Sequence, residues 1–463
     1  MALDANDQQM LKDIYRRLED NPLEPGSPFY EPIYQRPEGE DPVAKLATRI
    51  DLAGAESLQL FSGFRGMGKT TELFRLKRDL EQKGCLVLYA NALDYVSSSE
   101  EVDIVTLLMS IAGAFGEQLK DANDVNIMPE SFWKRFTNYL TRTTVEMPEV
   151  AAKAETGVPA IAKDLVGDIK AGVDVKMALK TAPSFRQKLE TFLANRLYEL
   201  KAEVNAFIED GVKRVRAQRG NPDLRIVLLF DQFEQIRGSR SNEQAVIQSV
   251  ERLFRDHIQS LRLPFVHVIY TVPPWLQFVL PGAFSIETLP CVRLWKNDEA
   301  RSQYKEGWNS FLDAIRKRFG QKDFAHVFGQ DPKTADSLVA ELIGKSGGHF
   351  RDLQRLFRET IVLILTWRPH LPVKPEVIER AIADIRSEFL PIAVDDARWL
   401  DKIAKRRDTA LPDSTPESIG RLSRFLDTHL VLFLTNGKDW YDLHPLIREE
   451  VAALAKIPAP PKN

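Results

Sequence analysis

The stretch Gly63-Phe-Arg-Gly-Met-Gly-Lys-Thr-Thr71 combines glycines, a lysine and hydroxyl side chains at a spacing that suits phosphate chemistry. It matches the pattern G-x-x-x-x-G-K-[ST] of a phosphate-binding loop. Glycines let the backbone wrap closely around an anion, and the first N–H groups of a following helix point at that anion. Lys69 can reach the β- and γ-phosphate oxygens of a nucleotide, and the Thr70 hydroxyl can bind Mg²⁺. We therefore expect nucleotide contacts from Gly63, Arg65, Gly66, Gly68, Lys69, Thr70 and Thr71.

This loop lies between two predicted elements, as its mechanism requires. Residues 57–62 form a short apolar run typical of a strand, and Leu73, Leu76 and Leu80 recur at helical spacing just after the loop. A glycine-rich turn with a chance lysine is the alternative interpretation. The flanking strand and helix favour a nucleoside triphosphate site over that alternative.

A second signal follows a largely apolar run at 224–230, which is typical of a strand buried in a parallel sheet. The carboxyl end of this strand carries Asp231, which can hold Mg²⁺ opposite Thr70. Glu234 is the candidate base that orients and deprotonates the attacking water. A surface acid or a structural ion pair is the alternative for Glu234.

Two further residues are candidates for sensing the terminal phosphate. Thr271 ends an apolar run at 265–271 and could contact the γ-phosphate or the attacking water, or could simply cap a strand. Arg351 follows a Gly-Gly turn at the start of a predicted helix, from which its guanidinium could reach the nucleotide. Lys345 is a lesser candidate for that contact, and a surface salt bridge is the alternative for Arg351. The predicted catalytic set is therefore Glu234, Lys69, Thr271 and Arg351.

The elements that must position these residues follow an α/β pattern. Five apolar runs joined by helical segments predict a three-layer P-loop NTPase core with a parallel five-stranded sheet, and these runs are 57–62, 85–90, 224–230, 265–271 and 286–294. The predicted domains are an N-terminal helix and proline-rich lead-in at 1–40, a core at 41–296 with a helical insertion at about 121–223, a helical lid bundle at 297–394, a winged helix at 395–456 and a flexible tail at 457–463. Within the insertion, 184–219 is predicted as one long helix, whereas 150–181 has weak periodicity typical of a mobile segment or an irregular hairpin.

The C-terminal pattern predicts a winged helix. Residues 415–427 follow a helical pattern, and two strand-type runs flank Asn436-Gly437, a strong hairpin signal. Such a module could read DNA through the helix that carries Arg421 and Arg424, or it could contact a protein or lock the nucleotide domain.

Composition restricts the class of protein. The chain has 463 residues, of which 44% are hydrophobic and 28% charged, as expected for a globular protein of several domains. A net charge of -3 gives no overall bias toward nucleic acid. Cys85 and Cys291 both lie in apolar runs, which favours small core residues over a disulfide or a metal site. The sequence shows no signal-peptide pattern and no apolar run of membrane-spanning length, so we expect a cytoplasmic protein without a membrane partner.

Taken together, the loop, the Asp-x-x-Glu segment, the strand ending in Thr, the Gly-Gly-x-x-Arg lid and the C-terminal module resemble the AAA+/STAND ATPases. The lid is similar to that of the origin-recognition and initiator ATPases. The amino-acid sequence of the loop, together with the later Asp-Gln-Phe-Glu, resembles that of poorly characterised bacterial ATP-binding proteins. Some of these proteins are encoded near mobile-element or phage-defence genes. The resemblance covers about residues 40–450 without the insertion. It implies ATP and Mg²⁺ as ligands of Lys69, Thr70 and Asp231, with Thr271 and Arg351 as first and second sensors.

One position departs from the pattern of this group. Many members carry Glu directly after the Mg²⁺-linked Asp, where this chain has Gln232. An amide can orient a water but accepts a proton poorly, so either Glu234 is the base or hydrolysis is slow. The group also uses an arginine from a neighbouring subunit, for which Arg255 or Arg262 is the candidate, and this implies a homo-oligomer.

Three functions from different classes are compatible with these signals. The first is an ATPase that hydrolyses ATP to ADP and phosphate and acts as a conformational or assembly switch. The second is an ATP-dependent DNA-binding initiator or transposition helper that uses the winged helix. The third is a nucleotide-bound scaffold with little hydrolysis for a partner effector, for example in phage defence, bound through the helical insertion or the winged helix.

Overall fold

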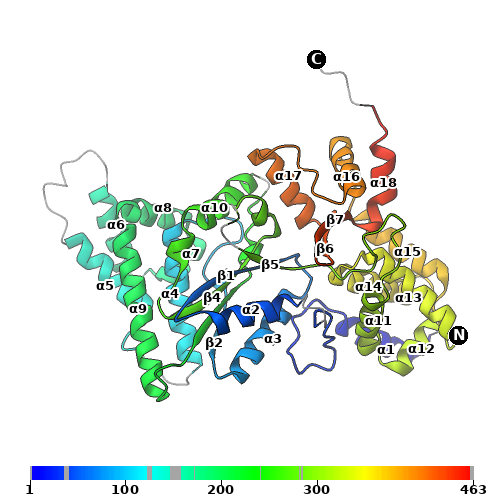
Figure 1. Cartoon of the computed structure of the whole chain (residues 1–463), viewed down its shortest axis with the longest axis horizontal. Helices are drawn as coiled ribbons and strands as arrows, with labels where there is room; N and C mark the ends of the chain where they lie inside the picture. Colours follow the sequence, from blue (N-terminus) through cyan, green and yellow to red (C-terminus); the bar gives the residue numbers. More distant parts are fainter. Residues whose placement is uncertain are drawn as a thin grey trace. The chain divides into compact units, whose positions relative to one another are not determined.

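A computed structural model describes residues 3–35, 41–122, 128–145, 158–170, 173–239, 241–280, 282 and 285–458 (Figure 1). The chain divides into two compact units. Unit 1 comprises Met1–Val43, Gly63–Arg75 and Thr288–Asn463, and unit 2 comprises Ala44–Ser62 and Leu76–Glu287. The phosphate-loop motif thus belongs to the same unit as the predicted lid and C-terminal module, whereas most of the sheet belongs to the other. The predicted domain boundaries stay a prediction.

Apolar strands form a five-stranded sheet in the order β2-β3-β4-β1-β5. The strands are β1 (Ser57–Gly63), β2 (Leu86–Asn91), β3 (Ile226–Asp231), β4 (Val266–Val272) and β5 (Ile286–Leu289). Every residue of β3 and β4 is buried, as expected for strands of a parallel sheet that is covered on both faces. Figure 1 draws the strands between α2 (Pro42–Leu52) on one side and α10 (Glu243–Asp256) on the other. The predicted α/β fold with a parallel five-stranded sheet is confirmed.

The register of the sheet aligns the polar residues at the carboxyl ends of the strands. Asn91 of β2 lies opposite Asp231 of β3, and Phe61 of β1 lies opposite Thr271 of β4, all in parallel pairs. The chain leaves β1 toward β2 on one side of the sheet and leaves β4 toward β5 on the other. Such a reversal is a topological switch point, where open α/β sheets bind their ligands.

The remaining helices of unit 2 include the predicted insertion, which is helical where the structure describes it. These helices are α4 (Ile104–Asp121), α5 (Phe132–Val145), α6 (Val158–Lys170), α7 (Val175–Thr181), α8 (Pro183–Leu193) and α9 (Leu197–Gln218). The single long helix predicted at 184–219 is wrong, because a short 3-10 turn, Ala194–Arg196, separates α8 from α9. Both helices pack on α4, and α8 also packs on α6. The predicted irregular segment at 150–181 forms α6 and α7 over its described part.

Unit 1 contains the predicted lid helices. They are α11 (Lys305–Phe319), α12 (Gln321–Phe328), α13 (Pro332–Ser346), α14 (Phe350–Thr366) and α15 (Pro375–Ser387), and α1 (Ala5–Arg17) packs on α11 and α14. Helix α3 (Lys69–Gln82) begins in this unit directly after the loop motif and continues into unit 2. Gly347, in the left-handed conformation with φ of 65°, ends α13 and allows the chain to turn into α14.

The C-terminal module also lies in unit 1. It comprises α16 (Val394–Arg406), α17 (Pro416–Asp427), the antiparallel strands β6 (Val431–Thr435) and β7 (Asp439–Leu443), and α18 (Arg448–Leu454). Thr415 caps α17, because its hydroxyl oxygen accepts a hydrogen bond from the Ser418 N–H at 3.3 Å. The predicted helix and hairpin are therefore present, whereas the winged-helix assignment stays a prediction. Most of the predicted tail, 459–463, lies outside the described residues.

Two further observations concern the cysteines and the apolar character of the helices. Cys85 and Cys291 are buried free thiols, as predicted. Among the described residues, no helix combines the length and the apolar character that crossing a membrane would need.

Candidate functional site

The loop between β1 and α3 adopts backbone angles that explain its glycines. Gly66 and Gly68 have φ of 87° and 85°, in the left-handed region that favours glycine. Helix α3 begins at Lys69, directly after Gly68. A loop that ends at a helix N-terminus presents backbone N–H groups together with the positive end of the helix dipole. The arrangement required for anion binding is therefore built into the local backbone.

The Lys69 side chain folds back over this loop. It is 5% exposed, and its Nζ donates to the carbonyl oxygens of Gly63 at 3.0 Å and Phe64 at 3.1 Å. Both of these acceptors are uncharged carbonyl oxygens. Phosphate oxygens are stronger, charged acceptors, so an anion on the loop would compete for the same ammonium protons.

The start of lid helix α14 is bonded to three consecutive loop residues. The His349 Nε2 atom lies 2.9 Å from the Arg65 carbonyl oxygen, the Phe350 N–H points at the Met67 sulfur at 3.3 Å, and the Arg351 N–H donates to the Gly66 carbonyl at 3.1 Å. A Cβ atom on Gly66 would lie 2.4 Å from the Arg351 Cβ, so only glycine allows this approach. The structure thus places the Arg351 backbone against the loop, and the sensor role of its side chain stays a prediction.

The Arg351 guanidinium pairs with a carboxylate of the N-terminal segment. Its Nε forms a close ion pair with Asp20, which follows α1 in the N-terminal segment. The side chains are 23% and 39% exposed, so this pair is partly solvated. Sequence reasoning gave Asp20 no role.

The proline-rich lead-in supports the first turn of α3. The Leu23 N–H donates to the Thr71 hydroxyl oxygen at 3.0 Å, and the Tyr30 hydroxyl donates to Glu72 at 3.0 Å. Burial, together with the Glu72 carboxylate, raises the pKa of Tyr30. Arg75 joins Glu72 to Asp41 through contacts of 2.7 to 2.8 Å. The start of α3 is therefore held in place by a buried polar network.

The predicted acidic and hydroxyl residues lie in unit 2 at the carboxyl edge of the sheet. Asp231 is fully buried, and the Tyr89 hydroxyl donates to it at 2.8 Å. The Thr271 hydroxyl oxygen accepts from the Phe233 N–H at 3.2 Å. Glu234 is 5% exposed, in a short 3-10 turn that follows Gln232, which has a left-handed φ of 67°. Asp231, Glu234 and Thr271 are thus gathered in one unit, while Lys69, Thr70 and Arg351 belong to the other.

The four arginines proposed for partner contacts all have local partners. Arg255 pairs with Glu251 and Asp256, and the Arg262 Nε donates to Gln259 at 3.1 Å. In the C-terminal module, one carboxylate holds both candidate DNA-reading residues. Arg421 donates to Asp396 at 2.6 and 3.1 Å, and Arg424 donates to it at 3.1 Å.

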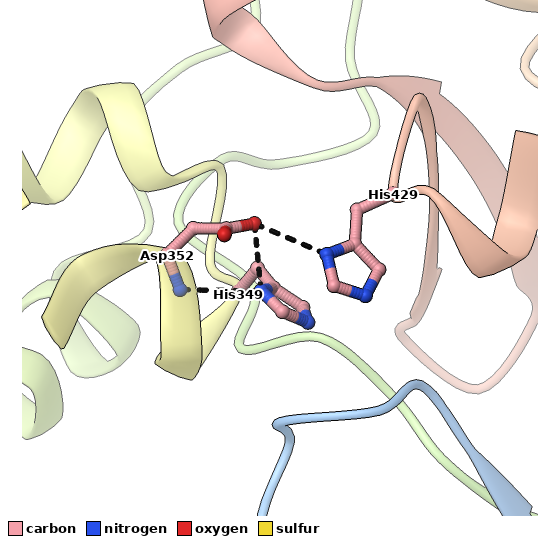
Figure 2. Close-up of side chains that lie close together, drawn as sticks. All are labelled: His349, Asp352 and His429. Atoms are coloured by element: carbon pink, nitrogen blue, oxygen red, sulfur yellow. Dashed lines mark hydrogen bonds and ion pairs between the residues drawn. The ribbon is translucent and has the colours of Figure 1, made fainter. Parts of the chain in front are cut away.

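A buried group of histidines around Asp352 is the feature that sequence reasoning missed. His349 and Asp352 lie at the start of α14, and His429 lies between α17 and β6 (Figure 2). The His444 Nε2 atom lies 3.4 Å from the same Asp352 oxygen. The spacing of His349 and Asp352 is visible in the sequence, but His429 and His444 are distant along the chain, so no local signal joins them.

Comparison with known proteins gave remote structural similarities only. No family model matches the sequence, and no curated protein matches it. Similar solved structures include the Aeropyrum pernix ORC2 protein in its ADP form, with 11% identity, coverage of 95% of this chain and 96% of that chain, and a TM-score of 0.42. Cdc6p from Pyrobaculum aerophilum has 12% identity, coverage of 92% and 96%, and a TM-score of 0.33. The Aeropyrum pernix ORC1 protein in complex with DNA has 14% identity, coverage of 91% and 94%, and a TM-score of 0.32. We base the fold on the strand order and register of this chain itself.

Proposed function

We propose that this chain binds ATP with Mg²⁺ in the Gly63–Thr71 loop and acts as an AAA+/STAND-type ATPase that switches conformation or assembly state. The observation that carries the proposal is the construction of the loop in unit 1. A buried lysine lies over a glycine turn at a helix N-terminus, and the backbone of α14 donates a hydrogen bond to the Gly66 carbonyl of that turn. Few other chemistries need a lysine, paired glycines and a helix start in this order.

Binding would exchange neutral acceptors for charged ones. The Lys69 ammonium group would leave the Gly63 and Phe64 carbonyls for the β- and γ-phosphate oxygens, because charge-assisted hydrogen bonds are roughly twice as strong as neutral ones. The backbone N–H groups at the start of α3 would supply the remaining donors.

The residues proposed for Mg²⁺ have suitable chemistry. Thr70 offers a hydroxyl oxygen and Asp231 a carboxylate, and Mg²⁺ prefers oxygen ligands. The Tyr89 hydroxyl orients one Asp231 oxygen from the neighbouring strand. A bound Mg²⁺ would neutralise charge on the β- and γ-phosphate oxygens.

Hydrolysis requires a group that orients and deprotonates water. Glu234 is the candidate, since its neighbour Gln232 is an amide and accepts a proton poorly. Thr271 would contact the γ-phosphate or the attacking water. A purely nucleotide-bound scaffold remains the alternative if Glu234 has no such role.

The DNA-binding alternative has less support. Arg421 and Arg424 are both bonded to Asp396, so their charge is already compensated within the module. Phosphate contacts by these arginines would first have to break those pairs. We therefore favour protein contacts for the C-terminal module.

Turnover of two variants tests the proposed activity. Lys69→Ala should abolish measurable ATP binding and hydrolysis, because it removes the ammonium group that holds the phosphates. Glu234→Gln should retain ATP binding but lower the hydrolysis rate by about 10²–10⁴, the usual contribution of a general base. Phosphate release under single-turnover conditions, with the protein in excess, would detect even slow hydrolysis.

Lys77→Ala is the matched control. Lys77 lies in the same helix, its side chain is 38% exposed, and its partner Glu81 is 3.9 Å away. This variant should hydrolyse ATP like the wild type. Equal turnover in the wild type, Lys69→Ala and Glu234→Gln would refute the ATPase proposal.

A further inference from the structure

Three side chains of unit 1 bring metal-ligand atoms together in its interior. The Asp352 Oδ2 atom lies 2.8 Å from His349 Nδ1 and 3.3 Å from His429 Nδ1 (Figure 2). All three ligand atoms lie within 4.8 Å of one another. The His349 and Asp352 side chains have 0% exposure, and that of His429 has 11%. The group therefore lies in a low-dielectric interior that opens on the His429 side.

The hydrogen bonds of His349 determine which of its nitrogens carries the proton. Its Nε2 faces the carbonyl oxygen of Arg65, at 2.9 Å, and must therefore donate. In the neutral tautomer that is protonated at Nε2, its Nδ1 accepts from the Asp352 backbone N–H at 3.3 Å. The same Nδ1 atom lies 2.8 Å from the Asp352 carboxylate oxygen Oδ2. At this distance the two atoms share either a proton carried by Nδ1 or a metal ion bound to both.

His429 provides a third ligand atom on the same side. Burial disfavours the charged form of this imidazole and lowers its pKa to about 3. The residue has φ of 60°, a left-handed conformation that costs a non-glycine residue about 1–3 kcal/mol. This backbone directs its Nδ1 toward Asp352, while its Nε2 is buried with no hydrogen-bond partner in the described part of the chain.

Two further side chains contact the Asp352 carboxylate. The His444 Nδ1 accepts from the Leu446 N–H at 3.3 Å, so its Nε2 carries the proton and points at Asp352 Oδ2. Arg355 donates to the other Asp352 oxygen at 2.9 Å. A histidine that ligates through one nitrogen and donates to a backbone carbonyl through the other, as His349 does, is the usual arrangement in metal sites.

We propose that His349 Nδ1, Asp352 Oδ2 and His429 Nδ1 form a site for a divalent transition-metal ion of the Zn²⁺ type. Two nitrogen or oxygen ligands on such an ion lie about 2.9 Å apart at a right angle and about 3.4 Å apart at a tetrahedral angle. The observed separations from Asp352 Oδ2 are 2.8 and 3.3 Å. Two imidazoles and a carboxylate are a ligand set used for zinc and for non-haem iron.

A bound ion would link three parts of unit 1 to one another. His429 belongs to the C-terminal module, Asp352 belongs to lid helix α14, and His349 is bonded to the Arg65 carbonyl of the phosphate loop. A proton on His349 could join only two of these atoms. A metal ion joins all three ligands, and so links the C-terminal module to the lid.

Zn²⁺ uptake by the full-length chain tests the site without nucleotide. After treatment with a chelator, the wild type should bind one equivalent of Zn²⁺ in native mass spectrometry and calorimetry. His429→Ala and Asp352→Asn should each weaken Zn²⁺ binding by at least about tenfold. His370→Ala, at an exposed histidine in the same unit, should bind Zn²⁺ like the wild type.

Co²⁺ in the wild type gives a second readout if either variant fails to fold by circular dichroism. The expected result is a visible d–d absorption band that Zn²⁺ removes. Failure of the wild type to take up either ion at tens of micromolar (about tenfold above a micromolar Kd) would overturn the proposal. Unchanged Zn²⁺ affinity in a folded His429→Ala variant would overturn it as well.

Discussion

Arg351 makes two different contacts from one position. Its backbone N–H holds the Gly66 carbonyl of the loop, whereas its guanidinium pairs with Asp20. The backbone contact is independent of side-chain type, so the helix can rest on the loop while the guanidinium pairs with Asp20. A γ-phosphate on the loop would carry more negative charge than a single carboxylate. It could also accept two parallel hydrogen bonds from the guanidinium. Asp20 would then compete with the nucleotide for Arg351.

Replacing Asp20 with Asn should therefore tighten the binding of ATP. Because partly exposed ion pairs contribute at most about 1 kcal/mol, we expect Asp20→Asn to tighten ATP binding by up to about fivefold. The affinity for ADP should not change, since ADP has no γ-phosphate. Titration of the variant and the wild type with ATP and with ADP, each in the presence of Mg²⁺, gives the ratio of the two affinities for each protein.

Asp13→Asn is the control for this comparison. Asp13 lies in α1, and its side chain is 40% exposed and pairs with Arg16 at 3.2 Å. It should leave both affinities unchanged. If Asp20→Asn shifts ATP and ADP affinities equally, Arg351 does not distinguish the two nucleotides.

Single residues differ in how far the sequence reveals them. Lys69 and Arg351 could be located because their neighbours in the chain form the motif, and the structure places both at the loop. Asp20 and His429 could not, because their partners are hundreds or tens of residues away. Their significance comes from packing within unit 1, which no local pattern encodes.

The turn between α13 and α14 determines where the lid meets the loop. Gly348 has φ of 88°, and a Cβ atom there would lie 1.9 Å from the Val292 carbonyl oxygen. The Gly348 carbonyl also accepts from the Val292 N–H at 2.9 Å. This glycine allows two backbone segments to touch just before His349 and Arg351.

Gly348→Ala should consequently destabilise unit 1. Left-handed strain costs about 1–3 kcal/mol, and the contact with Val292 adds to that cost. We expect the melting temperature of the transition to fall by at least about 4 °C in scanning calorimetry. The substitution would also displace Arg351 and weaken any nucleotide binding that depends on this residue.

Gly420→Ala is a control substitution at a glycine, and we expect it to have the opposite effect on the melting temperature. Gly420 lies in helix α17, and a Cβ atom added there would meet no other atom of the described residues within 4 Å. Alanine in a helix interior is more favourable than glycine by about 0.5–1 kcal/mol, so this variant should melt at the same or a higher temperature. Equal destabilisation by both substitutions would contradict the assigned role of Gly348.

Elements were predicted well where burial is uniform. The strands β1 to β4 follow from apolar runs because a parallel sheet buries both faces. The hairpin β6–β7 follows from Asn436-Gly437, and Gly437 has the left-handed φ of 86° that such a turn uses. The break between α8 and α9 was missed because the apolar spacing continues across the short turn Ala194–Arg196, and α8 packs on α6 as well as on the α4 that it shares with α9. Periodicity reports which face is apolar, not which neighbour covers it.

The assembly state of the whole chain follows from the proposed ATPase group. Arg255 extends from α10 with a side chain that is 43% exposed, and it is one candidate for completing a neighbouring subunit's site. Mass photometry should show growth beyond the monomer with ATP and Mg²⁺ but not with ADP or without nucleotide. Lys69→Ala should stay at its nucleotide-free size. The same mass distribution under all three conditions would contradict a nucleotide-driven assembly.

The most direct test of the account is equilibrium titration of the full-length wild type with ATP in the presence of Mg²⁺. The construction of the Gly63–Thr71 loop predicts one ATP per chain with a Kd between about 1 µM and 1 mM, the range in which enzymes bind such substrates. Absence of ATP binding throughout that range, in a chain shown to be folded, would contradict the central claim that this loop holds a nucleoside triphosphate.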